Sequence, residues 1–178
     1  MKENDIIDLY DLLLEQMRDL FDGLNQKLSF LEQIDPLADS SDLDELILAQ
    51  IKQAKYHKER LIHAFYLLDE DPTGETCKGI RALINSSLTL ADRCRVPEVK
   101  DASLITSIQH INHYEFAGYG TSIAYAKILD RHDLAEVLLD ILRESKEADD
   151  GLSNLAETAI NKNATWNSIV ASVVHEEK

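Results

Sequence analysis

Apolar residues recur at three- and four-residue steps along nearly the whole chain, which is the spacing of one buried helix face. The pattern predicts four long helices, at about 5–34, 41–68, 101–129 and 134–161. A shorter helix is expected at about 76–94, between the second and third long ones. No segment alternates apolar and polar residues for long enough to predict a strand. The chain is therefore expected to be all-α.

Proline and turn residues separate these helices. Asp35-Pro36 ends the first, residues 71–74 form a turn after the second, and Val96-Pro97 closes the shorter one. Short loops join the first two long helices and the last two, and such loops produce antiparallel hairpins. The stretch of about 30 residues between the hairpins can run the length of a bundle. We therefore predict a ferritin-like four-helix bundle with a long crossover that carries the additional shorter helix.

The net charge, the apolar runs and the cysteines limit the compartments and the binding partners that are expected for the protein. The 178 residues carry a formal net charge of −15, which disfavours binding to nucleic acid or to a membrane surface. No apolar run is long enough for a membrane span, and acidic residues interrupt the N-terminal segment where a signal peptide would lie. Cys77 and Cys94 fit a reducing cytoplasm as free thiols, with a disulfide as the alternative. We expect a cytoplasmic bundle over residues 1–162 and a tail, 163–178, that is partly docked or frayed.

Four polar side chains interrupt the apolar seams of the long helices: His57, Asn112, Glu115 and Ser145. Such positions face the middle of a four-helix bundle, where carboxylates and histidines hold metals in ferritin-like proteins. Most of the four are neutral, so the seams predict a polar site with part of that chemistry. Glu115 is costly to bury alone, which predicts a hydrogen-bonded network with His57, Tyr119 or Asn112.

The segment 112–121 reads Asn-His-Tyr-Glu-Phe-Ala-Gly-Tyr-Gly-Thr. It resembles the helix-three signature Glu-His-Tyr-Glu-x-Ala-x-Tyr-Gly-Thr of the YciE/YciF family, bacterial ferritin-like proteins of stress regulons. Glu59-Arg60-Leu61 with Phe65, Cys77-Lys78-Gly79, and the stretch 142–152 are similar to further segments of that family. The resemblance covers most of the chain. It implies a dimeric ferritin-like bundle with a dinuclear metal site at mid-bundle.

Carried over position by position, that metal site lacks most of its carboxylates here. Four glutamate positions of the family are occupied by other residues: Leu24, Gln53, Asn112 and Ser145. Two divalent ions bring four positive charges, and their desolvation is costly. The ligands that remain, Glu115, Asp149 and a neutral His57, supply about half of the negative charge that would balance them. We therefore expect no dinuclear centre and no resident cofactor. The fallback is a single Fe, Mn or Zn ion held by His57, Glu115 and Asp149.

Two functions follow as hypotheses, and both centre on a mid-bundle polar cluster. The cluster comprises His57, Asn112, Glu115, Tyr119, Ser145 and Asp149. We favour a non-catalytic bundle of stress-response type that acts through self-association or partner binding. The alternative is a metal-binding oxidoreductase or storage protein with a reduced site around His57, Glu115 and Asp149. A third reading is a small-molecule site in the gap lined by Asn112 and Ser145.

A homodimer is expected because the first helix carries a second apolar face beyond its seam. That face comprises Ile7, Leu12, Leu14, Phe21 and Phe30. The neighbouring histidines His110 and His113 share a helix face but lie off the seam, and we expect them to be surface residues rather than zinc ligands.

Overall fold

Five helices build most of the part of the chain that the computed structural model describes, residues 5–166 and residue 170. They are α1 (Leu9–Ile34), α2 (Ser41–Leu68), α3 (Lys78–Arg93), α4 (Pro97–Ile128) and α5 (His132–Leu155). A 3-10 turn (Asp35–Leu37), a π-helical turn (Ala156–Ile160) and the short α6 (Asn161–Asn163) complete the helical segments. The described residues contain no strand, so the all-α prediction is confirmed. Apart from residues 163–166 and 170, the predicted tail lies outside the described residues.

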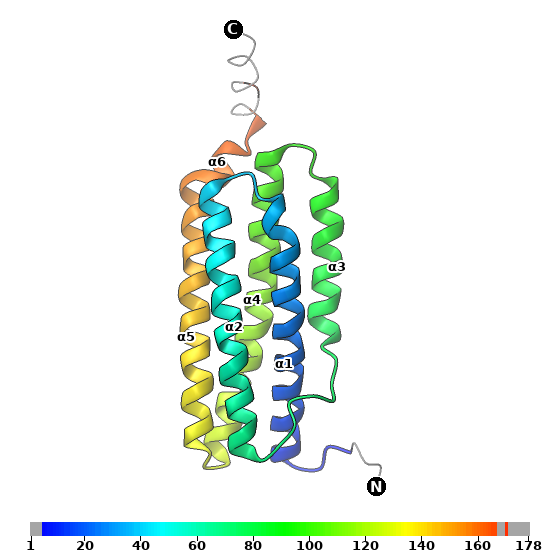
Figure 1. Cartoon of the computed structure of the whole chain (residues 1–178), viewed down its shortest axis with the longest axis vertical. Helices are drawn as coiled ribbons and strands as arrows, with labels where there is room; N and C mark the ends of the chain where they lie inside the picture. Colours follow the sequence, from blue (N-terminus) through cyan, green and yellow to red (C-terminus); the bar gives the residue numbers. More distant parts are fainter. Residues whose placement is uncertain (1–4, 167–169, 171–178) are drawn as a thin grey trace.

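Four of these helices close a ring in which every neighbouring pair is antiparallel (Figure 1). α1 packs against α2 and α4, and α5 packs against the same two helices. α3 runs back along the outside of the bundle, against α1 and α4, and brings the chain from the end of α2 to the start of α4. The predicted ferritin-like connectivity, with one long crossover that carries a shorter helix, is thereby confirmed.

The start of α4 differs from the sequence-based expectation. The helix begins at Pro97, four residues before the predicted start at Asp101. Proline is well suited to the first turn of a helix, because the amide it lacks would have no intrahelical partner there. Asp101 is instead buried one turn inside α4, and its two carboxylate oxygens accept the backbone N–H groups of Asp39 and Ser40 at 2.9 Å each. This carboxylate pins the α1–α2 connection onto α4.

The apolar interior consists of two clusters, one toward each end of the bundle. Members of the cluster nearer the N-terminal end include Leu13, Met17, Leu61, Phe65 and Leu138. Members of the other cluster include Leu31, Ile34, Ile47, Ile105 and Leu152. On each ring helix, buried polar residues separate the two clusters: Lys27 on α1, Gln50 on α2, Asn112 and Glu115 on α4, Ser145 and Asp149 on α5. The fold therefore places a polar layer between two apolar halves.

The second apolar face of the first helix does not lie on the surface. Leu14, Phe21 and Phe30 are buried in the chain's own core, because α1 packs against three helices rather than two. Leu12 is half-buried, and Ile7, which precedes α1, is exposed. The predicted dimer surface was therefore wrong in its location, since the crossover helix α3 adds a third neighbour to α1.

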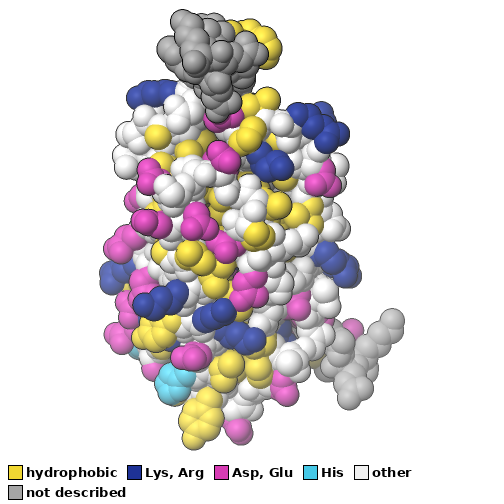
Figure 2. Space-filling view, turned by 45° about the horizontal axis from the view of Figure 1, so that its top comes forward, with side chains coloured by type: hydrophobic (Ala, Val, Ile, Leu, Met, Phe, Trp, Pro, Cys, Tyr) yellow, Lys and Arg dark blue, Asp and Glu magenta, His cyan; other side chains and the backbone are white. Residues whose placement is uncertain are grey.

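Acidic side chains are frequent on the face of the described surface that Figure 2 shows. Several acidic side chains lie along the left flank of this view, where basic side chains are also present, and further acidic, basic and hydrophobic side chains are interspersed across the middle. None of the described helices combines the length and the apolar character needed to cross a bilayer.

Candidate functional site

A buried lysine lies at the centre of the polar layer. The Lys27 Nζ atom, from α1, is 2.7 Å from Oε2 of Glu115 on α4. The two side chains are 8% and 1% exposed, so this ion pair is almost fully withdrawn from water. An internal pair of this kind forms only where the attraction between the charges offsets a desolvation cost of several kcal/mol per ion. The carboxylate that was expected to need a partner is thus neutralised from α1.

Lys27 was not among the predicted site residues, although the sequence contains a signal for it. The buried face of α1 follows alternating steps of four and three residues: Leu13, Met17, Leu20, Leu24, Lys27, Leu31 and Ile34. The apolar step from Leu24 to Leu28, which is half-buried, also fits helical spacing and passes over the lysine. Continuing the same alternation would have placed a lysine in the core.

The predicted partners of Glu115 do not bind it. Glu115 Oε2 pairs with Lys27, while His57 and Asn112 hydrogen-bond other residues. Within the described residues, Glu115 Oε1, Asn112 Oδ1 and the hydroxyl of Tyr119 have no hydrogen-bond partner. Burial raises the pKa of Tyr119 well above its usual value, and the charge of Glu115 adds to this effect. The hydroxyl of Tyr119 is thus neutral at physiological pH.

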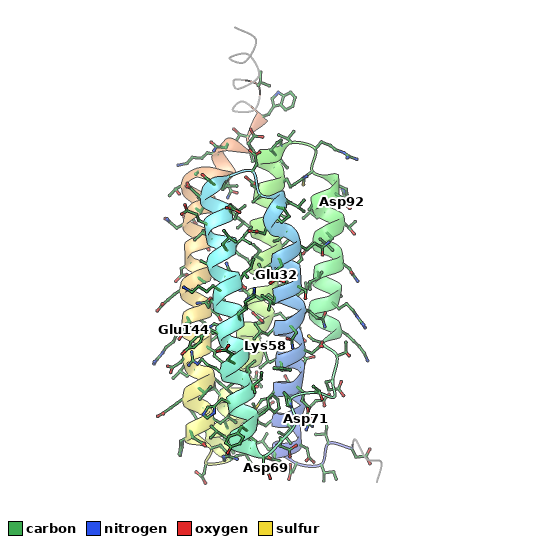
Figure 3. The ribbon with its side chains drawn as sticks, viewed as in Figure 1. Glu32, Lys58, Asp69, Asp71, Asp92 and Glu144 are labelled. Carbon is green, nitrogen blue, oxygen red and sulfur yellow. The ribbon has the colours of Figure 1, made fainter. Side chains whose placement is uncertain are left out.

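His57 joins α2 to α5. Its Nε2 lies 2.8 Å from Oε2 of Glu144, and Arg60 Nη1 donates to the other oxygen of Glu144 at 2.9 Å. Glu144 is labelled on α5 in Figure 3, at a height similar to that of Lys58 on α2. Burial lowers the pKa of His57; the hydrogen bond to Glu144 opposes this shift, and the charges of Lys27 and Arg60 reinforce it. The imidazole is therefore neutral near pH 7.

The same cluster fixes the state of Glu144. Burial alone would raise the pKa of this carboxyl, but the hydrogen bond from His57 and the charge of Arg60 together hold it below its usual value. Glu144 is therefore an anion that keeps two helices in contact.

A third bridge links α4 to α5 through Asp149. Asn112 Nδ2 donates to Asp149 Oδ1 at 2.8 Å, and His113 Nε2 lies 3.2 Å from Oδ2. Gln109 Nε2 is a longer contact of the same oxygen, at 3.4 Å. All six residues of the predicted polar cluster are buried, but only Asn112 and Asp149 are bonded to each other, while His57 and Glu115 bond to residues outside the cluster.

The residues present do not fit the dinuclear metal site that the resemblance implies. The ammonium of Lys27 already neutralises the glutamate that remains on α4, and it carries the same sign of charge as a metal ion. The three fallback ligands, His57, Glu115 and Asp149, each bind a different partner. Among the described residues, no three His, Cys, Asp or Glu side chains come together closely enough to hold a metal ion.

The Cys77-Lys78-Gly79 motif has a structural explanation. Cys77 begins α3, where its Sγ accepts the N–H of Ile80 and lies 3.3 Å from a carboxylate oxygen of Asp19. A Cβ at Gly79 would lie 2.6 Å from the ring of Tyr114, so glycine lets that ring pack on α3. Burial raises the pKa of Cys77, and both cysteines are free thiols.

The architecture and the polar layer define the class: a ferritin-like helical bundle. A family model described as "Domain of unknown function (DUF892)" matches residues 8–165, and the chain belongs to this family. Protein YciF of Escherichia coli K12 is 35% identical over 88 residues, a segment that spans 49% of this chain and 53% of YciF. The chain thus aligns in sequence with about half the length of this curated relative. The YciF resemblance found in the motifs is confirmed.

Solved structures support the same fold. YcfI of Rhodopseudomonas palustris, for which a structural role has been proposed, gives a TM-score of 0.83 at 31% identity, covering 86% of this chain and 98% of YcfI. The crystal structure of the E. coli stress protein YciF gives 0.84 at 24% identity, covering 88% and 99%. A Xanthomonas campestris protein gives 0.69 at 15% identity, covering 96% and 99%, and it supports the fold alone.

Replacing Lys27 tests the internal ion pair. Lys27→Met should lower the free energy of unfolding by about 3–5 kcal/mol, because Glu115 would stay buried without its partner. The double variant Lys27→Met with Glu115→Leu should recover most of this loss, since neither charge remains. The matched control is Lys55→Met, which removes an exposed pair with Glu32 and should cost about 0–1 kcal/mol. Urea unfolding measures all three, and equal losses for Lys27→Met and Lys55→Met would contradict a buried pair.

The lowered pKa of His57 predicts a loss of stability in mild acid. Below about pH 6.5 the unfolded chain binds a proton at this residue that the folded chain does not, so stability falls as the pH falls toward the folded pKa. The slope from this one group is at most about 1.4 kcal/mol per pH unit.

His57→Gln should flatten that slope, and denaturant unfolding between about pH 7 and pH 5 measures it. His132→Gln is the control, because His132 is 73% exposed. If the two variants keep the slope of the parent protein, the imidazole of His57 does not cause it.

Proposed function

We propose that this protein is a non-catalytic ferritin-like bundle of the bacterial stress response, and that it works in the cytoplasm by associating with itself. The observation that carries the proposal is the Lys27–Glu115 ion pair, an internal ammonium where a metal centre would need carboxylates. The E. coli relative is described as a stress protein, and a structural role has been proposed for the relative from R. palustris.

Side-chain bridges take over the task that metal ions perform in a ferritin-like centre. Such a centre ties the helices together through shared ligands. In this chain Lys27 ties α1 to α4, His57 ties α2 to α5, and Asp149 ties α5 to α4. Three of the four contacts around the ring are therefore bridged by a buried polar side chain, whereas the fourth, between α1 and α2, carries the exposed pair Lys55–Glu32.

The alternative, a metal-dependent oxidoreductase or storage protein, requires a larger change. His57, Glu115 and Asp149 would each have to exchange its present partner for a shared ion. The displaced ammonium of Lys27 would then lie buried beside a cation of the same sign, which the low dielectric of the interior penalises. This balance of charges favours the non-catalytic reading.

Introducing a carboxylate at position 27 tests whether the ammonium of Lys27 takes the place of a metal ion. Lys27→Glu should destabilise the metal-free bundle by like-charge repulsion with Glu115, and added Fe(II) or Mn(II) should restore the thermal midpoint. The parent protein should gain neither bound metal nor stability from the same ions, and chelators should leave its midpoint unchanged.

Lys58→Glu makes the same change of charge at a half-buried position of α2, and it should not create a metal response. Elemental analysis and thermal unfolding after anaerobic loading provide the readouts. Tight stoichiometric iron in the parent protein, with oxygen consumption, would contradict the proposal.

The outer face of α2 is the surface best suited to self-association. It exposes four large apolar side chains, Leu48, Tyr56, Ile62 and Tyr66. Lysines at positions 52 and 55 lie on the same face with Glu59, which makes a surface of both charges that can be complementary to itself across a two-fold axis. A second copy of this chain is therefore the occupant that we propose for this face.

Sedimentation velocity tests this arrangement. The parent protein should sediment with twice the mass of its chain, and Ile62→Glu should shift it toward the monomer because a charge would be buried in the interface. Ile128→Glu is the matched control, since Ile128 is also exposed but lies at the end of α4. A monomeric parent protein, or equal effects of both variants, would exclude the α2 face.

A further inference from the structure

An open groove lies over the outer side of α4, between α3 and α5. Its volume is about 740 Å³, and its walls include Leu83 of α3 and the rings of His110, His113 and Tyr114 of α4. In the ring of four helices α4 lies diagonally opposite α2, so the groove and the proposed association face are on different sides of the bundle. The groove therefore plays no part in the proposed function.

The polar side chains that line the groove already bind one another. Asp149 accepts a hydrogen bond from Asn112 on one oxygen. Its other oxygen lies within hydrogen-bonding distance of His113 and Gln109. Gln109 also donates to the hydroxyl of Ser153. An occupant would thus meet mainly apolar and aromatic surface, which favours apolar side chains over a polar or charged ligand.

The α3 wall of the groove continues beyond the groove itself. Leu83 and Leu90 lie on the same face of α3, because seven residues make about two turns of helix. Leu90 is 37% exposed, and the small side chain of Ser86 lies between the two leucines on this face. Since α3 and α4 are antiparallel neighbours, Leu90 lies nearer than Leu83 to the start of α4 (Figure 1). Leu90 and the groove together form what we call the apolar strip.

The C-terminal segment has an apolar face of its own. Its apolar residues follow the spacing of one helix face: Trp166, Ile169, Val170, Val173 and Val174. Polar residues at 167, 168 and 172 fall on the other side of such a helix. Trp166 and Val170, the members of this face that the structure describes, are 75% and 42% exposed. An apolar face of this size favours an apolar surface that covers it.

The segment begins at the end of the bundle toward which the apolar strip extends. α6 packs against α4, and Asn163 lines a pocket together with Glu98 in the first turn of α4 (Figure 1). From Glu98 to His110, α4 rises by about 18 Å. Residues 163–174 span about 17 Å as a helix, so they reach the groove. The chain already turns at residues 164–165, where the segment has to change direction.

Charges are complementary at the far end of this path. Glu176 and Glu177 follow the apolar residues of the segment. A segment that reaches the groove brings them toward its His113 end. The Nζ atom of Lys146 lies 6.0 Å from the centre of the Phe116 ring, which is 5.1 Å from the ring of His113. The ammonium of Lys146 thus lies where the two glutamates arrive.

We infer that residues 166–174 dock as a helix along the apolar strip of their own chain. Trp166 packs against Leu90, and Val173 and Val174 enter the groove beside Leu83. The segment is tethered at the end of the strip, so its effective concentration there is high and a second copy competes poorly for the same surface.

The fluorescence of Trp166, the single tryptophan of the chain, reports this docking in the full-length protein. Emission should lie at shorter wavelength than that of N-acetyl-tryptophanamide. Quenching by acrylamide should be about threefold stronger in Val173→Glu than in the parent protein, because release of the segment exposes the indole ring. Ser168→Glu adds the same charge on the opposite side of the helix and should leave the quenching unchanged.

Variants of the bundle test the other side of the contact. Leu90→Glu should release Trp166 as Val173→Glu does, and its partly exposed position leaves the core intact. Asn85→Glu is the control, because it adds the same charge at an exposed position on the opposite face of α3. The NMR signals of the His110 ring should shift in Val173→Glu and not in Ser168→Glu, since His110 lines the groove.

Three outcomes would overturn the inference. Equal quenching of the parent protein and Val173→Glu would mean that the segment is not docked. Equal effects of Leu90→Glu and Asn85→Glu, or unshifted His110 signals, would place the segment elsewhere. Loss of protection on dilution would assign the strip to the segment of a second copy. Sedimentation of Ile62→Glu reports on the α2 face independently of all three.

Discussion

Each charge that a helical bundle buries must be neutralised inside the bundle, because water cannot reach it. For the buried lysine and glutamate of this protein the requirement is met by one contact between α1 and α4, the ammonium of Lys27 on the carboxylate of Glu115. The apolar halves on either side depend on it, since an unpaired Glu115 would draw water into the layer that separates them. The rest of the layer is arranged around this contact.

A buried ion pair can add little to the stability of a fold and still make its helix packing specific. A buried ion pair is often no more stabilising than well-packed apolar residues, because desolvation consumes most of the attraction. Its geometry, however, tolerates little displacement of one helix along another, and buried polar residues can fix helix register in this way. The three bridges at mid-height therefore explain how long helices with repetitive seams keep a single alignment.

Periodicity and loop lengths were sufficient to predict the ring, the crossover and the polar positions on α2, α4 and α5. They were insufficient for α1. Leu24 and Leu28 also have helical spacing, and a long side chain with a charged end, such as Lys27, is expected on the surface. The partners of His57 and Asp149 depend on which turns face one another across the bundle, a property of packing rather than of spacing. The predicted location of the dimer surface was wrong for a related reason, since helical periodicity alone does not reveal that α3 packs against α1 as well as α4.

The position of the thiol at the start of α3 has a consequence for how this protein reacts with oxidants. Cys77 is fully buried beneath α1, where a Cβ added at Gly23 would lie 3.6 Å from its sulfur, and its raised pKa keeps it in the poorly reactive protonated form. An oxidant can attack this sulfur only after the crossover has lifted from the bundle, whereas Cys94 at the far end of the same helix is partly accessible. Oxidative damage at the two positions therefore proceeds by different routes: at Cys94 by direct collision, and at Cys77 at a rate limited by local opening.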